Sequence, residues 1–333
     1  MANVKKMNAA FWKDRKVLVT GATGIVGSWL VKDLLDASAE VTILVLDANP
    51  QSELYRSKDI NETSVVNGAL EDFWTVERAI NQYEIDTVFH LGAQTIVDTA
   101  YRFPLPTLES NIRGTYNLLE ACRIHKDLVK RIVIASSDKA YGEQTKLPYT
   151  EQTPLNGRFP YEVSKSCADL IAQSYFHTYQ LPLAIARCGN IYGGGDLNWS
   201  RIVPGTIRSF LRGERPAIRS NGKFIRDYIY VKDISRAYMS LAQRLDNKKL
   251  WGEAFNFSSE SPLSVLELVA IIQKLMKCEH LKPRILDCAK GEIPSQYLSS
   301  KKAQKILKWK SEFDFESGLS ETIDWYNAFL KQK

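Results

Sequence analysis

The feature that most constrains the fold is a glycine-rich turn, Gly21-Ala22-Thr23-Gly24-Ile25-Val26-Gly27. Residues 16–20, just before it, are apolar and rich in β-branched side chains, which is typical of a buried strand. Residues 29–35, after it, carry apolar side chains at helical spacing. A strand, a GxxGxxG turn and a helix in this order bring backbone N–H groups to a pyrophosphate at a helix N-terminus. We therefore expect a dinucleotide to be held by Gly21, Thr23, Gly24, Ile25, Val26 and Gly27.

An acidic residue follows the second expected strand, residues 40–46. Asp47 lies 20 residues after Gly27. A carboxylate at this place can accept a hydrogen bond from the 2′-hydroxyl of an adenosine ribose and would repel a 2′-phosphate. The pattern therefore favours NAD over NADP. Arg56 keeps the alternative open, since an arginine can bind a 2′-phosphate.

Strands and helices alternate along the first 190 residues. Besides the two strands above, strands are expected at 63–66, 86–91, 130–135 and 183–187. Further helices are expected at 72–83, 109–125 and 161–179. This rhythm predicts a Rossmann-type α/β fold, a doubly wound parallel sheet, in which ligands bind beyond the carboxyl ends of the strands. Polar or glycine-rich clusters occupy four of those ends, at 21–27, 92–94, 136–139 and 188–195.

The alternation ends after about residue 190, where Gly193-Gly194-Gly195-Asp196 opens a loop-rich stretch. Beyond it we expect helices at 204–212, 264–276 and 318–330, and strands at 224–230 and 253–257. We expect residues 1–190 to form the NAD-binding domain. Residues 191–333 are expected to form mostly a smaller, mixed α/β substrate-binding domain, from which the chain can return to the first domain.

Composition argues against several classes of protein. No apolar run reaches the roughly 18 residues of a membrane span, and residues 1–12 lack the apolar stretch of a signal peptide. The five cysteines and four histidines are scattered singly. We therefore expect no metal site, and reduced thiols in the cytoplasm. The net charge of +6 is too mild to indicate a nucleic-acid partner, but it suits an anionic small substrate.

Tyr161 and Lys165 carry the first catalytic signal. Four residues apart on a helix, they share one face. An ammonium group near a phenol lowers the pKa of the phenol, which would make Tyr161 a usable base near neutral pH. Ser137 lies at the end of the fifth expected strand. Its hydroxyl and the activated Tyr161 together could take the proton from a substrate alcohol while hydride leaves the carbon.

With Asn111, these motifs resemble the extended short-chain dehydrogenase/reductase family. The segments His90-Leu91-Gly92-Ala93-Gln94 and Arg226-Asp227-Tyr228 are similar to its nucleotide-sugar epimerase and dehydratase branch. The resemblance implies bound NAD, a nucleotide-diphosphate sugar as substrate, and a homodimer formed through helices 109–125 and 161–179. Further cofactor contacts implied by it are Ala69, Leu70, Leu91, Ala93, Gln94, Asn111, Tyr161 and Lys165. Implied substrate contacts are Gln94, Ser137, Asn190, Arg201, Arg226 and Asn256.

Asp138 and Lys139 bear on the reaction. Epimerases of this family usually have small residues after the catalytic serine, whereas Ser136-Ser137-Asp138-Lys139 resembles members similar to CDP-glucose 4,6-dehydratase. Oxidation at sugar C4 acidifies the C5 proton, so Lys139 is the candidate base and Asp138 the candidate acid for the departing C6 hydroxyl. Both roles require pKa values shifted by burial, because mutual attraction would stabilise the charged forms. The alternative is a structural salt bridge between the two side chains.

Three functions follow from these observations. The first is a nucleotide-sugar 4,6-dehydratase that forms a 4-keto-6-deoxy sugar through transient oxidation by bound NAD. The second is a nucleotide-sugar 4-epimerase, which would share Ser137, Tyr161 and Lys165 but would need no acid at position 138. The third is a non-catalytic nucleotide-sugar-binding protein. The sequence does not identify the nucleotide or the sugar.

Overall fold

A seven-stranded, all-parallel sheet forms the centre of the protein. The computed structural model describes residues 9–289 and 292–331, so most of the segment considered for a signal peptide lies outside the described residues. The strand order is β3 (Ser64–Asn67), β2 (Glu40–Val45), β1 (Lys16–Thr20), β4 (Thr87–His90), β5 (Arg131–Ser137), β6 (Leu183–Cys188) and β10 (Ala254–Phe257). The predicted doubly wound fold is confirmed.

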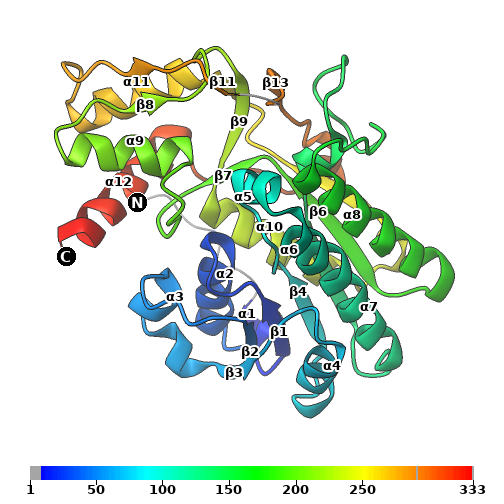
Figure 1. Cartoon of the computed structure of the whole chain (residues 1–333). Helices are drawn as coiled ribbons and strands as arrows, with labels where there is room; N and C mark the ends of the chain where they lie inside the picture. Colours follow the sequence, from blue (N-terminus) through cyan, green and yellow to red (C-terminus); the bar gives the residue numbers. More distant parts are fainter. Residues whose placement is uncertain (1–8, 290–291, 332–333) are drawn as a thin grey trace.

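Helices cover both faces of this sheet (Figure 1). One face carries α4 (Phe73–Gln82), α7 (Gly114–Ile124) and α8 (Pro160–Tyr179), and the other carries α2 (Ile25–Asp36) and α10 (Val231–Arg244). The sequence analysis did not predict α10, although buried Ile234, Ala237, Tyr238 and Leu241 follow helical spacing. Together with β10, this helix brings the chain back from the second half to the central sheet.

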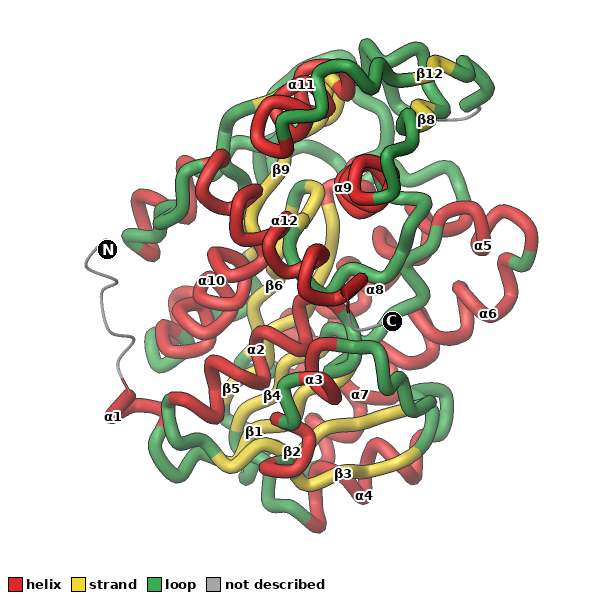
Figure 2. Tube along the Cα trace, turned by 90° about the vertical axis from the view of Figure 1, so that its left-hand side faces the viewer, coloured by secondary structure: helices red, strands yellow, loops and turns green. Residues whose placement is uncertain are grey.

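A smaller mixed lobe stands beyond one end of the sheet (Figure 2). Its strand β9 (Ile225–Tyr230) pairs antiparallel with β11 (Pro262–Ser264) and parallel with β7 (Asn190–Tyr192) and β13 (Ser295–Gln296). A second pair joins β8 (Ala217–Ile218) and β12 (Arg284–Ile285). The helices of this lobe are α9 (Ile202–Leu211), α11 (Val265–Met276) and α12 (Phe315–Lys331).

Short helical turns complete the described structure. They are α1 (Ala9–Trp12), α3 (Glu53–Arg56), η1 (Asp59–Glu62), α5 (Val97–Arg102), α6 (Pro104–Leu108), η2 (Glu109–Arg113), η3 (Asp138–Tyr141), η4 (Lys248–Leu250) and η5 (Ala303–Leu307). The helix expected at 109–125 thus begins as a π-helical turn, η2, before α7. Within the described ranges, no helix is long and apolar enough to cross a membrane.

Candidate active site

A cavity of about 1360 Å³ lies at the carboxyl ends of the central strands, between the sheet and the smaller lobe. Most of the residues predicted from the sequence line it, although they come from segments far apart in the chain. They are Gly21, Thr23, Gly24, Ile25, Val26, Gly27, Leu91, Ala93, Ser137, Asp138, Lys139, Tyr161, Lys165, Asn190, Arg201 and Arg226. Their chemical roles remain predictions, but the fold brings them to one place.

The glycine turn leaves room for a dinucleotide close to the backbone. Gly21 has φ of 72°, and a Cβ atom there would lie 2.7 Å from the amide nitrogen of Gly92. A Cβ atom at Gly27 would lie 2.1 Å from the carbonyl oxygen of Gly21. Only glycine fits these contacts, and they bring the backbone of the turn to the N-terminus of α2, where a pyrophosphate is favoured. The turn therefore fits NAD.

The ribose end is less enclosed. Asp47 lies two residues beyond β2 and is exposed, whereas Asn49, which the sequence analysis did not name, lines the cavity. Arg56 is already engaged: its guanidinium carbon lies 5.5 Å from the ring centre of Trp325 and 4.8 Å from that of Phe329. Since Arg56 stacks on α12, it gives little support to the NADP alternative.

Four residues predicted as cofactor contacts are not among those that line the cavity. Leu70 fills the space beside the Cα atoms of Gly92 and Gly114, and Ala69 precedes it. The amide side chain of Asn111 accepts a hydrogen bond from the Gln94 N–H (2.7 Å) and donates one to the Gln94 carbonyl oxygen (3.0 Å). Ala69, Leu70, Gln94 and Asn111 do not line the cavity. Leu70, Gln94 and Asn111 instead shape the segment that carries Leu91 and Ala93.

His90 holds the same segment through a chain of hydrogen bonds. The N–H groups of Leu91 and Gly92 donate to the Thr20 hydroxyl oxygen, at 3.1 and 2.9 Å. With both lone pairs occupied, the Thr20 hydroxyl donates to Nδ1 of His90, 2.9 Å away. Nε2 of His90 then carries the proton and faces the Thr115 hydroxyl oxygen at 3.1 Å. His90 is therefore a neutral imidazole, and burial lowers its pKa to about 3.

Tyr161, Lys165 and Ser137 come together as predicted, but the electrostatics differ from the expectation. Burial raises the pKa of Tyr161 to about 12, against the opposing effects of Arg201 and a hydrogen bond with Ser137. The Lys165 ammonium donates to the carbonyl oxygen of Ala135, and burial lowers the pKa of Lys165 to about 8. The expectation that Lys165 lowers the pKa of this phenol is therefore wrong: the groups that lower the pKa are Arg201 and Ser137, and desolvation outweighs both.

Asp138 and Lys139 do not form the structural salt bridge considered above. One carboxylate oxygen of Asp138 accepts a hydrogen bond from Ser137 at 3.0 Å, and the other is buried with no hydrogen-bond partner. Burial raises the pKa of Asp138, against the opposing charge of Lys139. Burial, followed by the positive charge of Arg226, lowers the pKa of Lys139. Both shifts favour the neutral forms that an acid and a base require.

The arginines of the smaller lobe line the outer cavity. Arg226 is buried and donates to the carbonyl oxygen of Ile225, and its second terminal nitrogen lies 3.7 Å from a Glu292 oxygen. Arg201 pairs with Asp196 at 3.1 Å. The sequence analysis missed Arg102, Arg208 and Arg219, which also line the cavity. Their positive charges suit a diphosphate.

Asn256 does not line the cavity, so its placement does not support the predicted substrate contact. Its side chain is fully buried, accepts a hydrogen bond from the Tyr141 hydroxyl at 2.7 Å and donates to the Tyr149 carbonyl oxygen at 3.2 Å. The reason is the place of β10 beside β6, which directs Asn256 into the protein interior.

No group of three or more metal-ligand residues occurs in the described part of the chain.

Comparisons with known proteins agree with this geometry. Residues 18–322 match the model of the family described as GDP-mannose 4,6 dehydratase. The chain is 30% identical over 339 residues to a CDP-glucose 4,6-dehydratase of Salmonella typhimurium, covering 96% of this chain and 93% of that protein. It is 31% identical over 324 residues to a dTDP-glucose 4,6-dehydratase of Mycolicibacterium smegmatis, covering 94% and 93%.

Solved structures with the same fold include both a 4,6-dehydratase and a 4-epimerase. A dTDP-glucose 4,6-dehydratase from Bacillus anthracis in complex with NAD superposes with a TM-score of 0.84, at 25% identity, over 94% of this chain and 97% of that chain. A UDP-glucose 4-epimerase from Thermotoga maritima with UDP-glucose superposes with a TM-score of 0.85, at 26% identity, over 94% and 99%.

Proposed function

The chain belongs to the GDP-mannose 4,6 dehydratase family, and we propose that it is a nucleotide-sugar 4,6-dehydratase that uses bound NAD in a closed redox cycle. The family expected from the sequence motifs is thereby confirmed. Similarity to dehydratases that act on CDP-glucose and dTDP-glucose supports the reaction, as does an NAD complex among the structural neighbours. Of these two nucleotides, CDP is our first choice, because Asp138-Lys139 resembles the CDP-glucose enzymes.

One observation carries this proposal: a buried carboxyl group and a lysine amine lie beside Ser137 and Tyr161 in one cavity. Burial raises the pKa of Asp138 and lowers that of Lys139. An epimerase needs only to remove and return hydride at one carbon. The additional acid and base are what elimination of water requires.

The chemistry that NAD supplies when bound is the removal of hydride from sugar C4 and its later return to C6. Tyr161, hydrogen-bonded to Ser137, takes the proton of the C4 hydroxyl. Lys139 then takes the C5 proton, the C6–oxygen bond breaks, and Asp138 gives its proton to the departing oxygen, so that water leaves. Lys139 would finally return a proton to C5. Arg201 and Arg226 bind the diphosphate.

A second candidate is a nucleotide-sugar 4-epimerase, since epimerases occur among the structural neighbours. The third is a non-catalytic sugar-nucleotide-binding protein. Incubation with CDP-, dTDP-, GDP- and UDP-sugars, followed by product mass and by NMR of the configuration at C4, separates all three. Loss of one water supports the dehydratase, and an isomer of unchanged mass would replace it with the epimerase. No turnover of any sugar nucleotide would favour the binding protein.

We further propose a homodimer formed through α7 and α8, which pack against each other (Figure 1). Exposed apolar side chains on these helices support this face: Tyr116, Ile124, Leu170 and Tyr179. Light scattering after size exclusion should give twice the chain mass, and Leu170→Glu should shift it to the mass of the monomer.

The five free cysteines fit the reducing cytoplasm, where we expect the protein to act.

A further inference from the structure

We propose that Arg187 is a positioning residue, which fixes the turn that carries Asp138 and Lys139 against the helix that carries Tyr161 and Lys165. The inference rests on the proposed dehydratase function. In this role, Arg187 keeps the residues that eliminate water at a fixed distance from the residues that oxidise C4. Arg187 itself is absent from the cavity wall.

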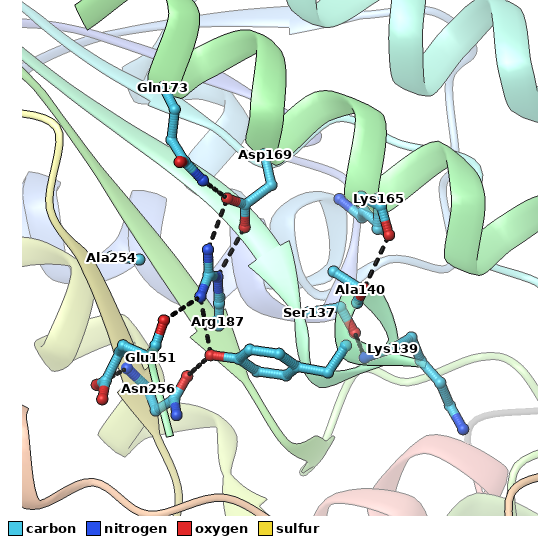
Figure 3. Close-up of polar contacts among 12 residues, drawn as sticks. Ser137, Lys139, Ala140, Glu151, Lys165, Asp169, Gln173, Arg187, Ala254 and Asn256 are labelled. Carbon is cyan, nitrogen blue, oxygen red and sulfur yellow. Dashed lines mark hydrogen bonds and ion pairs between the residues drawn. The ribbon is translucent and has the colours of Figure 1, made fainter. Parts of the chain in front are cut away.

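One side of the Arg187 side chain is bound to helix α8. Its Nε and Nη2 atoms each donate to one carboxylate oxygen of Asp169, both at 2.8 Å (Figure 3). Both side chains are buried, and Asp169 also accepts a hydrogen bond from Gln173 at 2.8 Å. Asp169 lies one helical turn after Lys165, so the two-pronged contact fixes Arg187 relative to the catalytic face of the helix.

The other side of Arg187 is bound to turn η3. Nη1 donates to the hydroxyl oxygen of Tyr141, at 2.9 Å. The proton of that hydroxyl goes to Asn256, at 2.7 Å, so the direction of each hydrogen bond is fixed. Tyr141 is the last residue of η3 and is fully buried. Arg187 therefore joins the end of the turn to α8.

A second contact ties the same turn to the same helix. The Ser166 hydroxyl, one residue after Lys165, lies 2.8 Å from the carbonyl oxygen of Ala140. Asp138 and Lys139 thus lie between strand β5, which precedes them, and Ala140 and Tyr141, which these hydrogen bonds attach to α8. In a turn of four residues, displacement of Tyr141 displaces the acid and the base. A misplacement of about 1 Å can slow a chemical step about 100-fold.

Stability alone gives a weak reason for this ion pair. Removing two charges from water costs free energy, and well-packed apolar residues often serve as well or better. The planar guanidinium, however, supplies four hydrogen bonds in fixed directions, two to Asp169, one to Tyr141 and one to the carbonyl oxygen of Glu151 (3.4 Å), which apolar contacts cannot do. The arrangement therefore suits a residue that sets relative position.

The test uses Tyr141→Phe in the full-length enzyme with CDP-glucose. The variant removes only the hydroxyl that Arg187 holds. The matched control is Tyr230→Phe, which removes the hydroxyl of another buried tyrosine, one that does not line the cavity. That hydroxyl donates to a carboxylate oxygen of Glu321 on α12, 2.7 Å away, and has no bond to Arg187 or to η3.

Single-turnover absorbance of reduced nicotinamide reports C4 oxidation, and product mass reports water loss. We expect Tyr141→Phe to oxidise C4 at nearly the wild-type rate and to lose water about 10- to 100-fold more slowly, with KM unchanged. Arg187→Lys, which loses the two-pronged contact with Asp169, should also lower the rate of water loss relative to the rate of C4 oxidation. Tyr230→Phe should keep the wild-type ratio of the two rates, even where its melting temperature falls.

Suppose that the wild-type enzyme loses water and that both Tyr141→Phe and Arg187→Lys keep the wild-type ratio of the two rates. The role of Arg187 is then wrong, while the proposed function stands. An equal change in Tyr230→Phe also overturns the role of Arg187, since any buried tyrosine hydroxyl would then have the same effect. If the wild-type enzyme turns sugar nucleotides over without losing water, the proposed function fails and the inference fails with it.

Discussion

The Lys165 ammonium group donates a hydrogen bond to the carbonyl oxygen of Ala135, 2.8 Å away. This contact joins α8 to β5 two residues before Ser137. It also holds the ammonium in a buried place, where its pKa falls to about 8. Burial raises the pKa of Tyr161 to about 12, and the positive charge of Arg201 and the hydrogen bond with Ser137 favour the loss of its proton.

Tyr161→Phe should lower kcat by about 100- to 10,000-fold, because the group that takes the C4 hydroxyl proton is lost. The content of NAD(H) after purification should fall much less than kcat, since the variant removes one expected cofactor contact and leaves the glycine turn untouched. Tyr179→Phe, an exposed tyrosine at the end of the same helix, is the control and should keep full activity. Wild-type turnover by Tyr161→Phe would assign proton removal to another group.

Asp138→Asn and Lys139→Met should stop the reaction at different steps. Asp138→Asn should still exchange the C5 hydrogen in deuterated water, but it should lose little water. Lys139→Met should still oxidise C4, seen as reduced-nicotinamide absorbance, without exchange at C5. Unchanged elimination by Asp138→Asn would rule out its role as the acid.

The pH dependence of these steps follows from the directions of the pKa shifts. Burial raises the pKa of Asp138, and water loss should fall as rising pH removes its proton. Burial lowers the pKa of Lys139, and exchange at C5 should fall as decreasing pH protonates the amine. Separate pH profiles of the two steps, measured by mass and by NMR, check both signs. Profiles of the same sign would contradict the assignment.

Asp47→Ala should weaken NAD binding by about 10- to 100-fold, the usual effect of losing a hydrogen bond to a charged group. Binding of NADP should improve relative to NAD, because repulsion of the 2′-phosphate is removed. Arg56→Ala is the control: Arg56 stacks on Trp325, so its loss should leave the ratio of the two affinities unchanged. Calorimetric titration of the apo-protein measures both, and a changed ratio in Arg56→Ala would reopen the NADP alternative.

His90→Gln should reduce the dependence of stability on pH. The folded protein holds His90 neutral with a pKa near 3, whereas the unfolded chain protonates it below about 6.5. Stability from this residue is therefore present above about pH 6.5 and is lost as pH falls, at up to about 1.4 kcal/mol per pH unit. Urea unfolding between pH 7 and pH 5 should give a steeper slope for wild type. Equal slopes would show that His90 does not titrate on unfolding.

The sequence predicted the central sheet because its signals are local. The turn at Gly21–Gly27 requires glycine at close contacts, and each buried strand is a short apolar run. The position of β10 beside β6 could not be read in this way, since strand order depends on contacts between distant segments. The buried place of Asn256 follows from that order.

Burial also explains where the pKa values at the site differ from those expected from the sequence. The spacing of Tyr161 and Lys165 correctly placed both side chains at the cavity, but it could not show that desolvation dominates the pKa of Tyr161. The same desolvation acts on Asp138 and Lys139 in the direction that the sequence analysis required. Helix α10 was not predicted, although its buried apolar residues follow helical spacing.

The most direct test of the account follows the hydride. CDP-glucose carrying deuterium at C4 is incubated with the enzyme, and the product is examined by mass spectrometry and NMR. The account predicts a 4-keto-6-deoxy product that has lost one water and carries the deuterium at C6. A product of unchanged mass, with deuterium still at C4 and the configuration at C4 inverted, would contradict it and would identify an epimerase.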